Sequence, residues 1–213
     1  MVRKISEIVP EDVLMRDFEK YRQRAIELGA TDANIITTDL IVVDERVRTK
    51  CMFPPCRIYG KCAHCPPNAP DLDLVRGLVR NFHYAIFTKI EVPSQHLAGP
   101  GVLEEGLHLP YTRQNFEMVL RIQAEAFHDG YYLAQGFGNG SCKAFLCQDA
   151  DCTALIPGQG CRFPYQSVPS LEALGMDAYL MATKAGWDVY PIGKSTSPAD
   201  VPHGVALGLI LIY

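Results

Sequence analysis

The sequence predicts a layered α/β or α+β fold, formed by a single domain that spans residues 1–213. Segments with helical periodicity alternate along the chain with runs rich in β-branched residues. Hydrophobic residues make up 48% of the chain and charged residues 21%, which is the usage of an ordinary globular domain. No low-complexity tract or long linker divides the chain. A chain of this length can bury a substantial core without cross-links.

The first half of the chain predicts two helices and their neighbouring strands. Apolar residues recur at helical spacing over residues 10–29, and a second helix is expected over 71–82, where Asp71 is a typical N-cap. Residues 34–47 contain β-branched runs that favour one strand or a short hairpin, and 83–92 favour a further strand. The first cysteine segment lies between these two groups of elements.

The second half repeats the order of helix, strand and cysteine segment, as a similarity of layout only. The expected elements are a helix over 111–129, a strand over 131–135, a helix over 170–185 that Gly175 interrupts, a short strand over 188–191 and a buried strand over 205–213.

The charge of the chain argues against two classes of partner. A formal net charge of −4 gives no overall attraction to nucleic acid or to an anionic membrane surface. The N-terminal residues lack the apolar run of a signal peptide, and no segment approaches a membrane-spanning length. We therefore expect a cytoplasmic protein, in which the thiols stay reduced and the cysteines serve a metal rather than a disulfide framework.

All eight cysteines fall into two clusters, whereas cysteines that only fill a core would be scattered among helices and strands. The first group is Cys51, Cys56, Cys62 and Cys65, with the spacing C-x4-C-x5-C-x2-C, and the second is Cys142, Cys147, Cys152 and Cys161, with the spacing C-x4-C-x4-C-x8-C. Short loops between thiolates let the backbone wrap around a soft metal centre.

Iron–sulfur clusters are favoured over zinc. Structural zinc sites usually combine two short cysteine pairs across a longer loop, whereas these segments offer single thiolates at intermediate spacing. The Cys65-Pro66 ending is similar to the Cys-Pro that closes bacterial ferredoxin runs. Two [4Fe–4S] clusters would use all eight thiolates, with one cysteine of a segment able to serve the other cluster, and a single cluster with spare cysteines is the alternative.

Several residues beside the cysteines are secondary candidates. His64 could ligate iron or donate a hydrogen bond to a cluster, or it could be an ordinary loop histidine. Four basic residues could offset the charge of a thiolate-bound cluster, or they could be solvated loop residues. These four are Arg57, Lys61, Lys143 and Arg162.

Three stretches, 56–67, 139–164 and 169–177, resemble the uncharacterised family of predicted metal-binding proteins known as domain of unknown function 2284. The second and third stretches, Asn-Gly-Ser-Cys through Cys-Arg-Phe-Pro and then Pro-Ser-Leu-Glu-Ala-Leu-Gly-Met-Asp, are the more specific part. The resemblance implies cysteine-based metal binding in a prokaryotic, often anaerobic, setting, without a settled reaction. The family pattern has no cysteine where Cys62 stands, so Cys62 is either the fourth ligand of the first cluster or a free thiol beside it.

Three functions remain open from the sequence. Four thiolates around each cluster favour electron transfer with a redox partner protein, whereas three leave an iron open to bind a small-molecule substrate in an enzyme. The third function is a zinc-bound structural or interaction module. The sequence identifies no catalytic residue, and it does not predict an oligomeric state.

Overall fold

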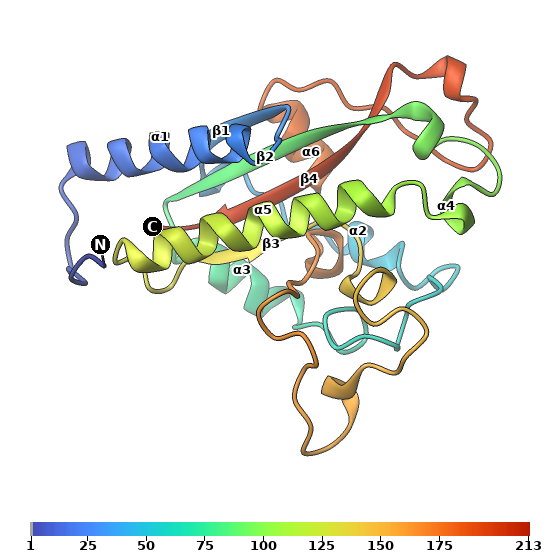
Figure 1. The fold of residues 1–213 in the computed structure, drawn as a ribbon, viewed down its shortest axis with the longest axis horizontal. Coiled ribbons are helices and arrows are strands. Elements are labelled where there is room, and N and C mark those ends of the chain that lie inside the picture. The colour runs from blue at the N-terminus through green and yellow to red at the C-terminus, as the bar shows by residue number, and fades with distance from the viewer. Residues whose placement is uncertain (1) are drawn as a thin grey trace.

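The computed structural model describes residues 2–213, apart from the side chain of Leu103. Its centre is a four-stranded sheet in the order β1-β2-β4-β3, in which every neighbouring pair is antiparallel (Figure 1). The strands are β1 (Asp32–Thr37), β2 (Tyr84–Pro93), β3 (Gln135–Phe137) and β4 (His203–Leu211). Helices and an antiparallel sheet confirm the predicted α+β class.

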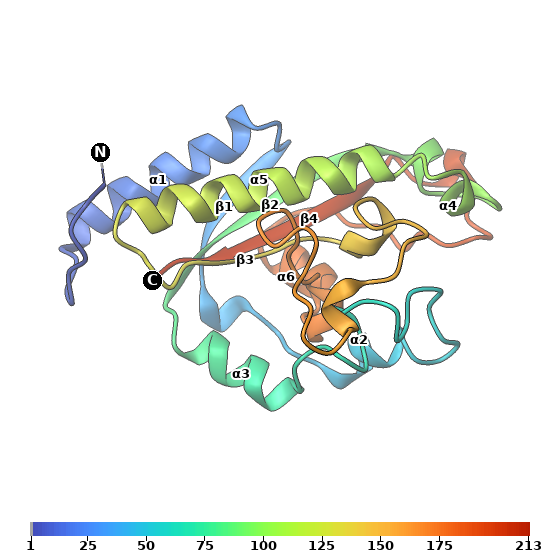
Figure 2. The ribbon, with the colours of Figure 1, turned by 60° about the horizontal axis from the view of Figure 1, so that its bottom comes forward.

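Helices cover both faces of the sheet (Figures 1 and 2). The helices are α1 (Glu11–Glu27), α2 (Glu45–Thr49), α3 (Leu72–Arg80), α4 (Val102–Glu105), α5 (Leu109–His128) and α6 (Ala178–Lys184). One hydrophobic core lies between the sheet and the long helices α1 and α5, and a second lies between the sheet and the pair α3 and α6. Within residues 2–213, none of the helices has both the length and the apolar character that crossing a bilayer requires.

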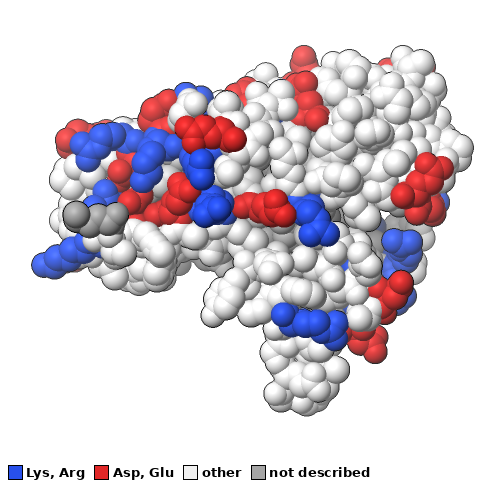
Figure 3. All heavy atoms as spheres, in the orientation of Figure 1, with Lys and Arg blue, Asp and Glu red and all other residues white. Residues whose placement is uncertain are grey.

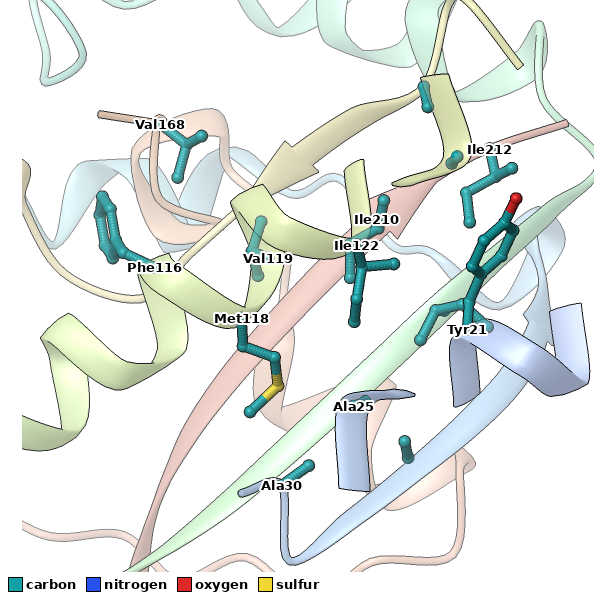
Figure 4. Close-up of a cluster of buried hydrophobic side chains, with 14 of the residues drawn as sticks. Tyr21, Ala25, Ala30, Phe116, Met118, Val119, Ile122, Val168, Ile210 and Ile212 are labelled. Atoms are coloured by element: carbon teal, nitrogen blue, oxygen red, sulfur yellow. The ribbon is translucent and has the colours of Figure 1, made fainter. Parts of the chain in front are cut away.

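The central strands supply both cores. Successive side chains of a strand point to opposite faces, so Ile86 of β2 enters the first core while its neighbour Phe87 enters the second. In the first core, Val119 and Ile122 of α5 pack over Ile210 of β4 (Figure 4). Burial of each such side chain stabilises the fold by roughly 1.5–3 kcal/mol, which explains why most residues of both central strands are apolar.

Two polar contacts, one part-buried and one buried, tie α1 to the end of α5. The Tyr21 hydroxyl donates a hydrogen bond of 2.7 Å to Asp129, which also forms an ion pair with Lys20. The Tyr131 hydroxyl donates a 2.8 Å hydrogen bond to the buried carboxylate of Asp17. These contacts fix the two long helices side by side over the sheet.

Glycines let α5 approach β3 closely. A Cβ atom on Gly136 would lie 2.3 Å from a methyl carbon of Val119, and one on Gly138 would lie 2.7 Å from the ring of Phe116. Because glycine has no side chain, the helix can rest on the backbone of this edge strand. The close contact fixes the chain just before the second cysteine segment begins at Cys142.

The structure confirms the helices expected over 10–29, 71–82 and 111–129 and the long strands expected over 83–92 and 205–213 within a few residues. The helix expected over 170–185 is reduced to a 3-10 turn over 172–174 and α6, which Gly175, with a left-handed φ of 72°, separates. The prediction of a strand over 131–135 is wrong, because the Tyr131 ring is anchored in the core and the backbone turns there, with a hydrogen bond from Ala134 N to Tyr131 O. The strand β3 begins only at Gln135.

The strand predicted over 188–191 also fails. Residues 188–191 form no strand, and the segment ends in Pro191, which has no N–H to donate to a sheet. Of the two alternatives expected for 34–47, β1 confirms the single strand and not the hairpin. After β1 the chain forms a 3-10 turn and α2, and Val43 forms an isolated bridge to Met176. The apolar side chains of this stretch pack into the second core instead of pairing with another strand.

Charged side chains are unevenly spread on the face shown in Figure 3. Acidic and basic residues alternate along α1 and α5. The part of the molecule that extends lowest in this view has no charged side chain at its tip. Residues 153–161, between the last two cysteines, include no charged residue. The protruding part of the second cysteine segment therefore has an uncharged end.

Candidate metal centre

The two cysteine segments lie side by side at one end of the sheet (Figures 1 and 2). The sulfur atoms of Cys62 and Cys142 are 3.6 Å apart. The Cys65 thiol donates a 3.4 Å hydrogen bond to the Ser141 hydroxyl. The fold thus brings the end of the first segment to the start of the second.

The first segment is a series of turns closed by backbone hydrogen bonds. Cys56 N donates to Cys51 O over 2.9 Å, and Cys65 N donates to Cys62 O over 3.2 Å. Gly60 N donates to Pro66 O, which closes the loop that carries Cys62. These backbone hydrogen bonds hold the segment in a series of turns, in which Cys62 is buried and Cys56 is exposed.

The second segment begins with a left-handed glycine. Gly140 has a φ of 69°, which turns the chain out of β3, and the Ser141 hydroxyl then accepts a hydrogen bond from Lys143 N as the cap of a 3-10 turn. Leu146 N donates to Cys142 O over 2.8 Å, which directs the chain toward Cys147.

The long loop of the second segment is closed near its ends. The Thr153 hydroxyl donates a 2.8 Å hydrogen bond to Gly160 O, so that Cys152 and Cys161 are held near each other. The sulfur of Cys161 accepts a 3.3 Å hydrogen bond from Phe163 N. These contacts direct the last cysteine back toward the start of the segment.

Five of the eight predicted ligands line one narrow cavity. They are Cys62, Cys142, Cys147, Cys152 and Cys161. The free volume of the cavity is about 20 Å³, about the space of one water molecule, so the thiols stand close around it. The structure thus gathers the whole second group and adds one cysteine of the first.

The other three cysteines lie outside the lining of this cavity. Cys56 is exposed, whereas Cys51 and Cys65 are half-buried. All eight cysteines are free thiols. Three members of the first group therefore do not share the cavity that gathers the second group.

Two charged residues that the sequence analysis did not single out act on Cys51. Burial raises the pKa of the Cys51 thiol, and the nearby Glu172 carboxylate raises it further, whereas Arg48 lowers it. Glu172 Oε2 and the Nε and Nη2 atoms of Arg48 are buried without a hydrogen-bond partner within the described structure. The only signal in the sequence was the place of Glu172 in the Ser-Leu-Glu stretch at 170–172.

The thiols at the junction of the segments compete for negative charge. Contacts with the thiols of Cys142 and Cys65 lower the pKa of Cys62, and the same contacts, together with burial, raise the pKa values of Cys142 and Cys65. Deprotonation of Cys62 is therefore favoured, whereas deprotonation of Cys65 or Cys142 as a second thiolate is unfavourable. A cation bound among these sulfurs would offset the repulsion between neighbouring thiolates, so that several of them could be deprotonated and serve as metal ligands.

His64 lies at the same cavity, with Nδ1 3.9 Å from the sulfur of Cys142. The histidine is therefore directed toward the thiols and is not an ordinary exposed loop residue. Over residues 2–213, no three His, Cys, Asp or Glu side chains converge closely enough to hold one metal ion. The structure brings five thiols and one imidazole to the lining of a single cavity. Sulfur and imidazole donors suit soft metals.

The four basic residues beside the cysteines differ in burial. Arg57, Lys61 and Arg162 are exposed, whereas Lys143 is buried, with 9% of its surface accessible. Arg57, Lys61 and Lys143, together with the acidic Asp149 and Asp151, line a cleft of about 660 Å³. This cleft adjoins the cysteine cavity, because both are lined by Lys143 and Cys152.

Comparisons with known proteins give one match. A search of the curated proteins and a search of the solved structures both returned no match. A scan against protein-family models matched residues 34–212 to the family described as predicted metal-binding protein (DUF2284). The matched region holds all eight cysteines and most of the chain. The chain therefore belongs to this family of predicted metal-binding proteins.

Proposed function

We propose that this protein is an iron–sulfur protein that transfers single electrons to or from a redox partner. The observation that carries the proposal is the cavity lined by Cys142, Cys147, Cys152 and Cys161. Four thiolates complete the coordination of a [4Fe–4S] cluster, which when bound supplies one-electron chemistry. In this proposal residues 1–213 form a single iron–sulfur domain.

The chain would hold the group through three kinds of contact. The four thiolates bind, Cys161 is oriented by its 3.3 Å hydrogen bond from Phe163 N, and His64 can donate a hydrogen bond to a sulfur. Because the free volume of the cavity is about 20 Å³, loading requires the loop over 153–161 to move outward. We expect hydrogen exchange in that loop to differ between the metal-free and the loaded protein.

A second cluster would use the cysteines of the first segment. Cys51, Cys56 and Cys65 are outside the main cavity, so this cluster would have three thiolates of its own. That count supports a second candidate function, an enzyme in which an open iron at the first segment binds a small-molecule substrate. The buried and unpartnered Glu172 Oε2 near Cys51 offers an acceptor for such a substrate.

The setting that goes with the proposal is a reducing cytoplasm, in which thiols stay available as metal ligands. The prokaryotic and often anaerobic setting implied by the family resemblance belongs to the same proposal. Zinc is the alternative metal, since a set of four thiolates also satisfies a tetrahedral zinc site.

Metal analysis of anaerobically purified protein tests the proposal. We expect a brown protein with about four irons and four acid-labile sulfides per chain for each cluster. Cys147→Ser, which removes a thiol of the main cavity, is expected to lower the iron content, and the exposed Cys56→Ser should leave the main cluster in place. A colourless preparation with stoichiometric zinc would refute it.

A further inference from the structure

Lys143 is the one buried residue among the four basic residues beside the cysteines. It follows Cys142 directly, and its side chain is one of the walls of the cysteine cavity. Its three counterparts, Arg57, Lys61 and Arg162, extend into solvent. Only Lys143 is therefore placed where its charge acts at short range and with little screening by water.

The hydrogen bonds of the Lys143 ammonium use two of its three donors and do not neutralise its charge. Nζ donates to Gln148 O over 3.0 Å and to Ala150 O over 2.8 Å. Within the described structure it forms no ion pair with a carboxylate. A buried charge without an opposite charge is unfavourable, so the site is suited to a negative group.

The position of Lys143 identifies what that negative group would be. Gln148 and Ala150 belong to the loop between Cys147 and Cys152, so the ammonium also holds this loop between two cavity thiols. A cluster bound by thiolates carries net negative charge. We propose that Lys143 is the built-in counter-charge of the centre in the cysteine cavity and raises its reduction potential. This inference rests on the iron–sulfur function proposed above.

The expected direction follows from the charge balance. Reduction adds one electron from the partner to the centre, with no bond broken and no proton moved. The reduced centre is more negative by one charge, so a fixed ammonium stabilises it more than the oxidised form. Removing the charge of Lys143 should therefore lower the midpoint potential.

Three variants separate charge from hydrogen bonding and packing. Lys143→Gln removes the charge but keeps an N–H donor for the loop carbonyls, whereas Lys143→Arg keeps the charge. Lys61→Gln makes the same charge change at an exposed residue of the adjoining cleft. The measurements are iron and sulfide content, and an anaerobic redox titration with dithionite as the electron donor, followed by the visible spectrum.

We expect Lys143→Gln to make reduction at least about tenfold less favourable, a shift of about 59 mV to lower potential. Lys143→Arg should stay near the wild type, and Lys61→Gln should shift less than Lys143→Gln. Loss of iron in Lys143→Gln but not in Lys143→Arg would also support the counter-charge. Equal potentials in Lys143→Gln and Lys61→Gln, or equal iron loss in Lys143→Gln and Lys143→Arg, would overturn it. A wild-type protein without iron and sulfide instead refutes the iron–sulfur function itself.

Discussion

The sulfur atoms of Cys62 and Cys142 lie 3.6 Å apart, although 80 positions separate the two residues in the chain. Cys62 is also the most buried of the eight cysteines, with 1% of its surface exposed. Cys62, which the sequence left as either a fourth ligand or a free thiol, thus stands at the contact between the two segments. Its surroundings connect it with the second group of cysteines and not with Cys51 and Cys56.

Replacing Cys62 by Ser tests that connection. Because Cys62 lines the cavity of the second group, we expect Cys62→Ser to alter the electron paramagnetic resonance spectrum of the main cluster while most of its iron is retained. Cys142→Ser should lose that cluster's iron, about half of the total if two clusters are present. Exposed Cys56→Ser is the control and should leave the main spectrum unchanged. A Cys62→Ser spectrum identical to the wild type would contradict the placement of Cys62.

The same distance predicts a cross-link in the metal-free protein. Diamide takes two electrons and two protons from a pair of thiols and forms one disulfide bond. Because the sulfurs of Cys62 and Cys142 are adjacent, we expect mass spectrometry of digested protein to show the 62–142 pair as the main linked species. Loading the protein with metal first should suppress the reaction. Predominant linkage through the exposed Cys56 would be at odds with the structure.

The contacts of Tyr21 and Lys20 with Asp129, which tie α1 to the end of α5, should make the stability of the fold depend on pH. Partial burial by itself raises the pKa of Asp129, but hydrogen bonds from Lys20 and Tyr21 outweigh it, so the pKa lies below its ordinary 3.8. Such a group stabilises the fold above its unfolded pKa, and the contribution is lost as the pH falls through the folded pKa.

Asp129→Asn tests this dependence. We expect it to reduce the free energy of unfolding by about 1–2 kcal/mol near neutral pH, mainly through the charged hydrogen bond from Tyr21. The difference from wild type should shrink in urea titrations below about pH 4. Asp73→Asn, at a carboxylate that is 94% exposed, is the matched control and should change little. A destabilisation that stays constant down to pH 2 would contradict a stabilising contribution from the ionised Asp129 carboxylate.

Gly138→Ala tests the close packing of α5 on β3. The added methyl would lie 2.7 Å from the Phe116 ring, so we expect a loss of about 1–3 kcal/mol in stability, seen as a lower melting temperature. Because Cys142 follows shortly after this strand, the iron content should fall as well. Gly193→Ala, where a methyl meets no atom within 4 Å, is the control. Equal melting temperatures for the two variants would show that the helix does not press on the strand.

Local patterns predicted the parts of the fold that depend on local physics. Helical periodicity over 10–29 and 71–82 corresponds to α1 and α3, and the apolar run near the C-terminus corresponds to β4. The pairing of β4 with β2 on one side and β3 on the other depends on contacts far apart in the chain, and no local pattern contains that information. The same limit explains why the 131–135 strand was misplaced.

The candidate site was predictable in composition but not in arrangement. The spacing of the cysteines identified the residues, yet the contact of Cys62 with Cys142 arises only when the two segments meet at the end of the sheet. Burial likewise separates Lys143 from Lys61, although both have a cysteine as a direct neighbour in the sequence. Glu172 and Arg48 were missed because neither belongs to a recognisable ligand pattern.

The meeting of the two segments also concerns the unfolded chain. A centre that joined residues across the 80-position separation of Cys62 and Cys142 would close a long loop in the denatured ensemble and restrict its conformations. By the chain-entropy relation for a cross-link over that span, the restriction is worth about 4–5 kcal/mol. That is a large share of the stability of an ordinary domain. Loss of metal would then lower the free energy of unfolding. Proteolytic degradation of the chain would therefore be faster when metal is scarce.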